Sequence, residues 1–263
     1  MTDYKSIISN SENMVDTIWL NRPEVHNSMD PVMIRELTTQ IRISEADENI
    51  RLIIIRGKGP SFSSGADLKY MQQMNGFSKD ENHEDAEKLA DLFFTIYNCS
   101  KPVFAIAHGN VAGGANGIIA ASDYALCTHR TLFRISETKL GLIPATISPY
   151  IIRRLGEFKA LELMLTGKPF SGQEAKEFKL VNNAVSDKEF ERSINDIIRF
   201  FLSSAPKASI ALKALVRTIA GKEINQEIKK LTSGILADTR ASSEAREGLS
   251  SFFEKRKPNW SLK

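Results

Sequence analysis

The chain is predicted to be an α/β protein with a helical segment at its C-terminal end. In the first half, short apolar strands alternate with amphipathic helical patterns, whereas from about residue 157 helical patterns follow one another. The 263 residues are 42% hydrophobic and 25% charged, which is enough for a sizeable core. We therefore expect a β/α core over residues 1–190 and a helical region over residues 191–263.

Four strands are expected in the core, because each run is short and rich in β-branched or apolar residues. They are VDTIWL (15–20), LIIIRG (52–57), VFAIAH (103–108) and YALCTH (124–129). Two longer helical patterns lie between them, at 31–45, where Asp30 can cap the helix, and at 85–97. Such alternation is typical of βα units.

The helices of the second half follow from apolar periodicity and from end signals. One ends at Gly167, a suitable C-terminal cap, and a short one opens from Ser171. The last four are expected at 190–202, 207–220, 223–236 and 243–255. These four can pack on the core or on another subunit.

Charge and composition exclude several classes of function. A net charge of +3 gives little attraction to nucleic acid or to an anionic membrane. The basic residues of the C-terminal helices alternate with apolar ones, which is typical of a solvated helix face. Neither a signal peptide nor a long apolar span is evident, so a cytoplasmic location is expected. Two cysteines 28 residues apart and four scattered histidines indicate neither a disulfide framework nor a metal site.

One pattern occurs twice: an apolar strand, a glycine, a turn of small residues, another glycine and then a helix. It is formed by LIIIRGKGPSFSSGADLKYM and by VFAIAHGNVAGGANGIIAA. A helix start leaves backbone N–H groups unpaired, and glycines let a ligand approach them. Two such starts that meet would bind an oxygen that becomes negative during a reaction. Tight turns or close packing of helix on strand explain the glycines equally well.

Other known binding and catalytic motifs do not match this sequence, but one acidic residue is a candidate for proton transfer. The glycine spacing is not GxGxxG, TGKPFS lacks the final residue of a P-loop, and GPSFS is not a nucleophile elbow, although Ser64 with a distant histidine could still form a hydrolase site. Glu137 lies in an uncharged local frame of Ile135, Ser136 and Thr138, and a carboxyl in apolar surroundings suits proton transfer near neutral pH. A surface glutamate paired with Lys139 is the alternative that the local sequence favours.

Six stretches together resemble the enoyl-CoA hydratase/isomerase (crotonase) superfamily, in the order in which that family has them. They are LNRPEVHNSM, FSSGADLKYM, HGNVAGGANGIIAASDYAL, FRISETKLGLIPA, LTGKPFSGQEAKEFKLVNNAV and REGLSSFFEKRKPNW. The resemblance implies a spiral of ββα units with two roughly perpendicular sheets and a C-terminal helical trimerisation region. It also implies homotrimers or hexamers, an acyl-CoA substrate and no cofactor other than the coenzyme A of that substrate.

The resemblance assigns roles to particular residues. The thioester oxygen would lie between the N–H groups of Ala66 and Gly114, with Glu137 as the acid/base. Further contacts to the substrate are expected at Val25, Ser64, Asp67, Leu68, Gly117 and Pro144. Gly117 stands where two-glutamate hydratases carry their first glutamate, whereas Glu24 and His26 replace the lysine and leucine that are frequent in relatives.

The expected function is hydration of an α,β-unsaturated acyl-CoA by a single glutamate. The alternatives are a Δ3,Δ2-enoyl-CoA isomerase, another crotonase reaction such as thioester hydrolysis or decarboxylation, and a non-catalytic CoA- or RNA-binding protein. SETKLGLIPATISPY and GGANG look most like bacterial methylglutaconyl-CoA hydratases of leucine catabolism. A glutaconyl substrate carries its own carboxylate, and glycine at 117 would spare it a like-charge neighbour.

Overall fold

The computed structural model describes residues 4–261, which divide into two compact units. The first consists of the described parts of Met1–Cys99 and Val103–Ile194, and the second of Ser100–Pro102 and the described part of Asn195–Lys263. None of the helices in the described residues is long and apolar enough to cross a membrane.

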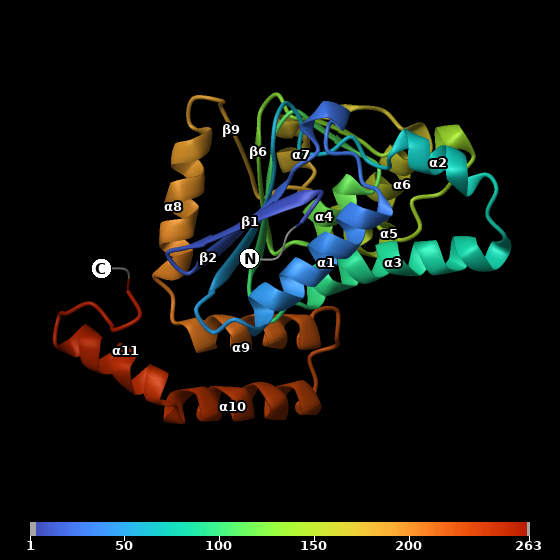
Figure 1. The fold of residues 1–263 in the computed structure, drawn as a ribbon. Coiled ribbons are helices and arrows are strands. Elements are labelled where there is room, and N and C mark those ends of the chain that lie inside the picture. Colours follow the sequence, from blue (N-terminus) through green and yellow to red (C-terminus); the bar gives the residue numbers. More distant parts are fainter. Residues whose placement is uncertain (1–3, 262–263) are drawn as a thin grey trace. The chain divides into compact units, whose positions relative to one another are not determined.

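The first unit is built on two sheets (Figure 1). The strands are β1 Ile7–Glu12, β2 Val15–Leu20, β3 Leu52–Gly57, β4 Val103–Ala107, β5 Asn110–Ala112, β6 Tyr124–Thr128, β7 Leu132–Arg134, β8 Phe170–Ser171 and β9 Asn183–Val185. The large sheet has the order β1-β2-β3-β4-β6-β9 and the small one β5-β7-β8. In the large sheet only β1 and β2 are antiparallel, and in the small sheet β5 and β7 are parallel. These sheets and the helices between the strands confirm the expected α/β class.

Several helices of the first unit begin at a side chain that caps them. They are α1 Pro31–Ala46, α2 Leu68–Met74, α3 Lys79–Asn98, α4 Ala115–Ala121, α5 Ser148–Leu155, α6 Glu157–Thr166 and α7 Gly172–Glu177, with the 3₁₀ turns η1 Pro23–Val25 and η2 Glu137–Leu140. Asp30 caps α1, as expected, by accepting the N–H of Met33. Helix α3 begins six residues before the expected start because Ser78 and Glu81 form a capping box.

The core lies between the large sheet and the helices α1, α3 and α4, which cover one of its faces (Figure 1). Inward-facing strand residues such as Ile18, Ile53 and Ile55 are fully buried. They join the apolar stripes of α1 and α3 in one cluster, which includes Leu37 and Phe93. This packing fixes the ends of β3 and β4, from which the two glycine-rich segments leave the sheet.

The second unit is helical, with α9 Pro206–Ile219, α10 Gln226–Ala241 and α11 Ser243–Phe253. Helix α8, Phe190–Leu202, has the expected bounds and runs across the division between the units. Helix α10 starts three residues after the expected position because Asn225 caps it, and it continues to Ala241. Glu244 of α11 accepts the N–H groups of Lys207 and Ala208, which satisfies the start of α9.

Candidate active site

The two segments that leave β3 and β4 run side by side. The N–H of Phe62 donates to His108 O at 2.8 Å, and the N–H of Ser63 donates to Asn110 O at 3.1 Å. Gly65 follows with φ +89°, and a Cβ on it would lie 2.8 Å from Ala112 O. Only glycine fits this contact, because both the backbone conformation and the space exclude a side chain. The repeated strand–glycine–helix pattern therefore brings its two copies together.

Ala66, the residue after Gly65, has an unpaired N–H. The N–H of Met29 donates to Gly65 O at 2.7 Å, and the N–H of Asp67 donates to Met29 O at 3.0 Å. In this parallel pairing the N–H of Ala66 points to the side away from Met29. Within residues 4–261 it has no acceptor, so it is free to donate to a ligand.

Gly114, which opens α4, presents the second free N–H. Gly113 before it has φ +50° and donates its own N–H to Arg134 O at 3.0 Å. The N–H of Gly114 belongs to the unpaired donors of a helix start and has no acceptor in the described part of the chain. The two segments touch through Gly65 and Gly113, each of which directly precedes a residue with a free N–H.

The carboxyl of Glu137 lies at this contact. Strand β7 pairs with β5 so that Arg134 stands opposite Ala112, and the chain then enters η2 at Glu137. A Cβ on Gly113 would lie 3.3 Å from Glu137 Oε1 and 3.9 Å from Gly65 Cα. The three segments predicted to carry the chemistry are thus adjacent.

Burial disfavours the charged form of Glu137 and raises its pKa above the usual range of a glutamate. The backbone N–H groups of Glu137 and Ser136 partly offset this effect. Its Oε2 is buried and has no partner among residues 4–261. A buried carboxyl oxygen without a partner is costly in a fold and fits a group that acts on a substrate.

The space beside Gly117, an expected substrate contact, is filled by apolar side chains. A Cβ on Gly117 would lie 2.4 Å from Ile147 Cγ2 and 2.6 Å from Phe93 Cε1. The ring of Phe93 also reaches to 3.8 Å from a Cβ on Gly114. Gly117 is therefore buried behind a hydrocarbon wall, and an ionised side chain does not fit there without rearrangement. Pro144, three residues before Ile147, is buried in the same segment.

The residues predicted to contact coenzyme A differ in exposure: some form an exposed rim, and one is buried beneath it. Val25, Ser64 and Leu68 are exposed, and the hydroxyl of Ser64 donates to Val25 O at 3.3 Å. Asp67 is buried and caps α2 by accepting from the N–H groups of Lys69 and Tyr70. The structure therefore places Asp67 beneath the rim.

Arg22 and Ser28 hold Asp67 in place. Arg22 Nη2 lies 2.9 Å from Asp67 Oδ2, to which Ser28 Oγ also donates at 3.0 Å. Burial alone would raise the pKa of Asp67, but the N–H of Tyr70, the Ser28 hydroxyl and Arg22 together keep it below its usual value.

Four residues of the site were missed by sequence reasoning. Met29, Phe93 and Ile147 reach it only through tertiary packing, because they belong to other elements. Asn116 had a signal that could have been used: it is the one polar side chain in the buried helix ANGIIAA. Its Nδ2 donates to Gly113 O at 3.0 Å and to Arg134 O at 2.9 Å.

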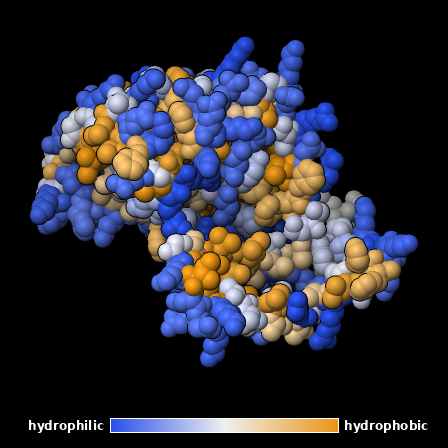
Figure 2. Space-filling model, turned by 180° about the vertical axis from the view of Figure 1, so that it is seen from behind, coloured by the Kyte–Doolittle hydropathy of each residue, from blue (hydrophilic) through white to orange (hydrophobic). Residues whose placement is uncertain are grey.

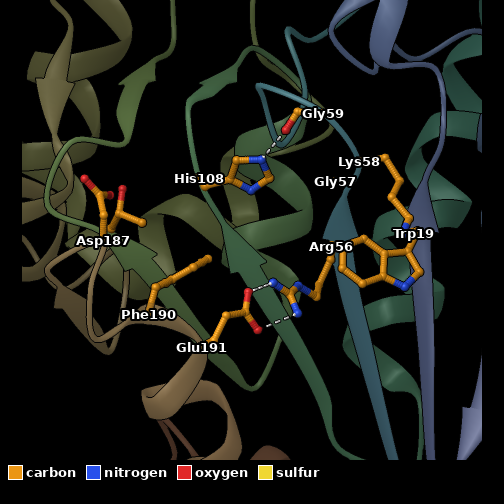
Figure 3. A pocket seen from close by; sticks show the side chains of 10 residues that line it. Trp19, Arg56, Gly57, Lys58, Gly59, His108, Asp187, Phe190 and Glu191 are labelled. Atoms are coloured by element: carbon orange, nitrogen blue, oxygen red, sulfur yellow. Dashed lines mark hydrogen bonds and ion pairs between the residues drawn. The ribbon is translucent and has the colours of Figure 1, made fainter.

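A hollow of about 350 Å³ elsewhere in the first unit contains none of the predicted site residues (Figure 3). Its cations already have partners. Arg56 pairs with Glu191 and lies over the ring of Trp19, and Lys58 Nζ lies 3.9 Å from the centre of that ring. No group of three His, Cys, Asp or Glu side chains in residues 4–261 is placed to hold a metal ion.

Comparison with known structures and sequences identifies the class. The enoyl-CoA hydratase of Shewanella pealeana superimposes with a TM-score of 0.93 at 33% identity, covering 97% of this chain and 96% of that one. The human mitochondrial enoyl-CoA hydratase domain-containing protein 3 is 30% identical over 252 residues, which are 94% of this chain and 80% of the human protein. The trans-2-decenoyl-(acyl-carrier-protein) isomerase of Streptococcus mutans is 27% identical and covers 99% of this chain and 100% of its own.

The fold and the paired loops thus define a crotonase-type protein. The model of the enoyl-CoA hydratase/isomerase family matches residues 10–263, and the chain belongs to that family.

Proposed function

We propose that the protein is an enoyl-CoA hydratase that adds water to an α,β-unsaturated acyl-CoA thioester with Glu137 as its single acid/base. One observation carries the proposal: the buried carboxyl of Glu137 lies against Gly113, where two segments with free N–H groups meet. The similarity to proteins named as hydratases supports the same reaction.

The free amides of Ala66 and Gly114 are suited to hold the thioester oxygen. Attack at the β-carbon moves negative charge onto this oxygen and forms an enolate. Fixed backbone donors need no reorganisation when the charge develops, and each contributes about 3 kcal/mol in comparable sites. The rim of Val25, Ser64 and Leu68 is where the coenzyme A part would bind.

A single carboxylate can complete the proton balance. Glu137 takes a proton from water as the water oxygen bonds to the β-carbon and the double-bond electrons move toward the thioester oxygen. When the enolate collapses, Glu137 returns that proton to the α-carbon. The net change is addition of one H and one OH, and Glu137 ends as it began. Its raised pKa makes it a stronger base near neutral pH than an exposed glutamate.

The test is a hydration assay with crotonyl-CoA and 3-methylglutaconyl-CoA that follows the loss of the conjugated enone. Glu137→Gln should lower kcat by about 10³-fold, the range of a lost general acid/base. Glu48→Gln, in an exposed loop, is the matched control and should leave kcat unchanged. Retained activity in Glu137→Gln would remove Glu137 from the mechanism. Thioester binding without any turnover would favour a CoA-binding protein.

Isomerisation is the second candidate, and the wall formed by Phe93 and Ile147 favours it. That wall offers no polar group to hold a water molecule, whereas a shift of the double bond needs only one carboxylate to carry a proton between the α- and γ-carbons. With 3-hexenoyl-CoA, a gain of conjugated enone faster than hydration of 2-hexenoyl-CoA would establish the isomerase as the main activity.

For the acyl group we propose a methylglutaconyl-type substrate. The motif resemblance and the lack of a carboxylate at position 117 support this substrate, since a second enzyme carboxylate would repel that of the substrate. Gly117→Glu is a poor probe because even its Cβ would clash with Ile147. The sharper test compares 3-methylglutaconyl-CoA with its distal methyl ester. An equal or higher kcat/KM for the neutral ester would contradict the proposal.

We also propose that the chain assembles into trimers or hexamers through its second unit. Figure 2 shows apolar side chains gathered in the lower part of the molecule. In the second unit, Ile224, Leu249, Phe252 and Phe253 are all more than half exposed. Apolar surface of this extent is typical of a protein interface.

A further inference from the structure

Asn116 occupies an unusual position in the first turn of α4. It is fully buried, and its Nδ2 donates to Gly113 O at 3.0 Å and Arg134 O at 2.9 Å, with Val111 O at the longer distance of 3.5 Å. Three carbonyls around one end of the amide fix its orientation, because the reverse orientation would place oxygen against oxygen. Its Oδ1 is buried with no partner in residues 4–261. The unpaired oxygen costs free energy that an apolar side chain would not cost. The hydrogen bonds donated by Nδ2 must therefore offset that cost.

The donor end acts on the peptide group that carries the proposed hole. Gly113 C=O and Gly114 N–H are the two ends of one planar peptide, so a bond that fixes the oxygen also fixes the direction of the N–H. Gly113 O accepts both the backbone N–H and the side-chain amide of Asn116. Hydrogen bonds to a carbonyl oxygen polarise the amide and strengthen its N–H as a donor.

This peptide needs such a restraint because it joins two glycines. Gly113 already has φ +50°, and glycines on both sides give a peptide unusual freedom to rotate. A rotated peptide would present a carbonyl oxygen, rather than an N–H, to the forming enolate. Asn116 also binds Arg134 O, which accepts the N–H of Gly113 and lies three residues before Glu137.

We propose that Asn116 is a positioning residue for the Gly114 N–H donor, an inference that rests on the proposed use of that N–H to hold a thioester oxygen. Asn116 touches neither substrate nor reacting atoms in this role. Its loss should weaken binding of the anionic transition state far more than binding of the neutral thioester.

The test uses Asn116→Ala in the full-length protein, with Ser122→Ala as a matched control. Ser122 follows the same helix and donates to a backbone carbonyl, Ile118 O, at its other end. In Asn116→Ala, kcat should fall about 100-fold, as for other impaired oxyanion donors, with KM changed less than about threefold. Ser122→Ala should leave both constants unchanged even if it lowers the melting temperature to the same extent.

A binding measurement separates this inference from the proposed hydratase reaction. Acetoacetyl-CoA forms an enolate that absorbs in the near ultraviolet, so its bound enolate fraction reports the hole without turnover. That fraction should fall about tenfold in Asn116→Ala, whereas the affinity for saturated butyryl-CoA should stay within about threefold. A wild-type protein that binds the enolate but hydrates nothing would refute the hydratase and leave the role of Asn116 intact.

Conservative variants complete the design. Asn116→Ser should be intermediate, because a serine hydroxyl in a helix can donate to the carbonyl three residues before it, here Gly113 O. Should Asn116→Ala fail to fold, Asn116→Ser and Asn116→Asp supply the comparison, since they differ in donor capacity. An unchanged enolate fraction in Asn116→Ala or Asn116→Asp, or a wild type that stabilises no enolate, would overturn the proposal.

Discussion

Glu137 couples the proposed chemistry to the stability of the fold. Burial raises its pKa, so over the pH range between its usual and its raised value the unfolded chain is ionised while the folded chain is not. The stability of the protein therefore falls as pH rises through this range. The group that the proposed reaction requires therefore lowers the stability of the fold at neutral pH.

Glu137→Gln should accordingly stabilise the protein at pH 7 while it removes activity. The expected gain is about 1 kcal/mol, or about 2 °C in Tm, after allowance for the partial solvent contact of the carboxyl. The gain should shrink strongly at pH 4, where the wild-type carboxyl is mostly protonated in both states. Thermal unfolding at both pH values and one protein concentration measures it; a gain independent of pH would contradict the assigned cause.

The pKa of Asp67 is shifted in the opposite direction, so its effect on the pH dependence of stability is also opposite. Its lowered pKa means that it stabilises the fold above the usual pKa of an aspartate, and this contribution is lost as pH falls through the lowered value. Asp67→Ala should cost about 2 kcal/mol at pH 7, because it removes a helix cap and the partner of Arg22. The difference from wild type should shrink at pH 3 in urea titrations. Asp91→Ala, which breaks an exposed pair with Arg42, is the control, with a cost below about 0.5 kcal/mol.

Sequence motifs were informative about residues whose proposed roles depend on their own backbone or charge. Ala66, Gly114 and Glu137 lie in segments whose order and spacing matched a family, and the fold brings those segments together. Phe93 and Ile147 could not be assigned in this way, because the sequence of buried apolar residues does not indicate which residues of other elements they contact. Their contact with Gly117 is a product of tertiary packing.

Among the elements, helix α4 matters most for the proposed site. Its N-cap residue Gly114 carries the proposed N–H donor, and its Gly117 packs against Phe93 and Ile147. Its C-terminal end is fixed by the partly buried Arg154, whose Nε and Nη2 donate to Ala120 O and Ser122 O at 3.1 and 2.6 Å. A cation at the end of a helix also interacts favourably with the helix dipole. Both ends of the helix are thus held by side chains.

Gly117→Ala tests how tightly α4 is packed. In an open helix this change stabilises by about 1 kcal/mol, but here the new Cβ would meet Ile147 and Phe93, so we expect a net loss of about 2 kcal/mol. Gly234→Ala in α10, where nothing lies within 4 Å of the added Cβ, is the matched control and should stabilise the protein. Chemical denaturation measures both. Stabilisation by Gly117→Ala would contradict this prediction, since it would mean that Ile147 and Phe93 move aside at little cost in free energy.

Periodic helices and strongly apolar strands were predictable, whereas polar strands and strands of two or three residues were not. Helices α1 and α8 were found nearly to the residue, because their apolar periodicity extends over several turns. Strand β1 was missed because its sequence IISNSE is largely polar and is held by antiparallel pairing with β2. The strands β5, β7 and β8 have two or three residues each, and only their mutual pairing makes them strands.

At the scale of the whole molecule, the apolar side chains of the second unit predict assembly. A mass about three or six times that of the 29.4 kDa chain is expected in light scattering coupled to gel filtration. Phe252→Asp, at a side chain that is 76% exposed, should shift the protein toward the monomer. Lys255→Asp, close to it in sequence but polar, controls for charge. A monomeric wild type would exclude this use of the surface.

The α/β class and the order of the elements followed from periodicity, whereas the meeting of the two glycine segments did not. Local sequence left open whether those glycines serve tight turns or a ligand. In the fold Gly65 and Gly113 turn the chain and also allow the close approach that leaves two N–H groups free, as the proposed ligand site requires.

The proposed donors are main-chain atoms, and this has a consequence for evolution. A single substitution can delete a side chain, but only a change to proline removes a peptide N–H, so selection can vary the side chains around the proposed site while the means of holding the oxygen is retained. Divergence toward new thioesters should therefore be recorded in positions such as Phe93 and Ile147, and an engineer who wishes to alter the substrate should begin there.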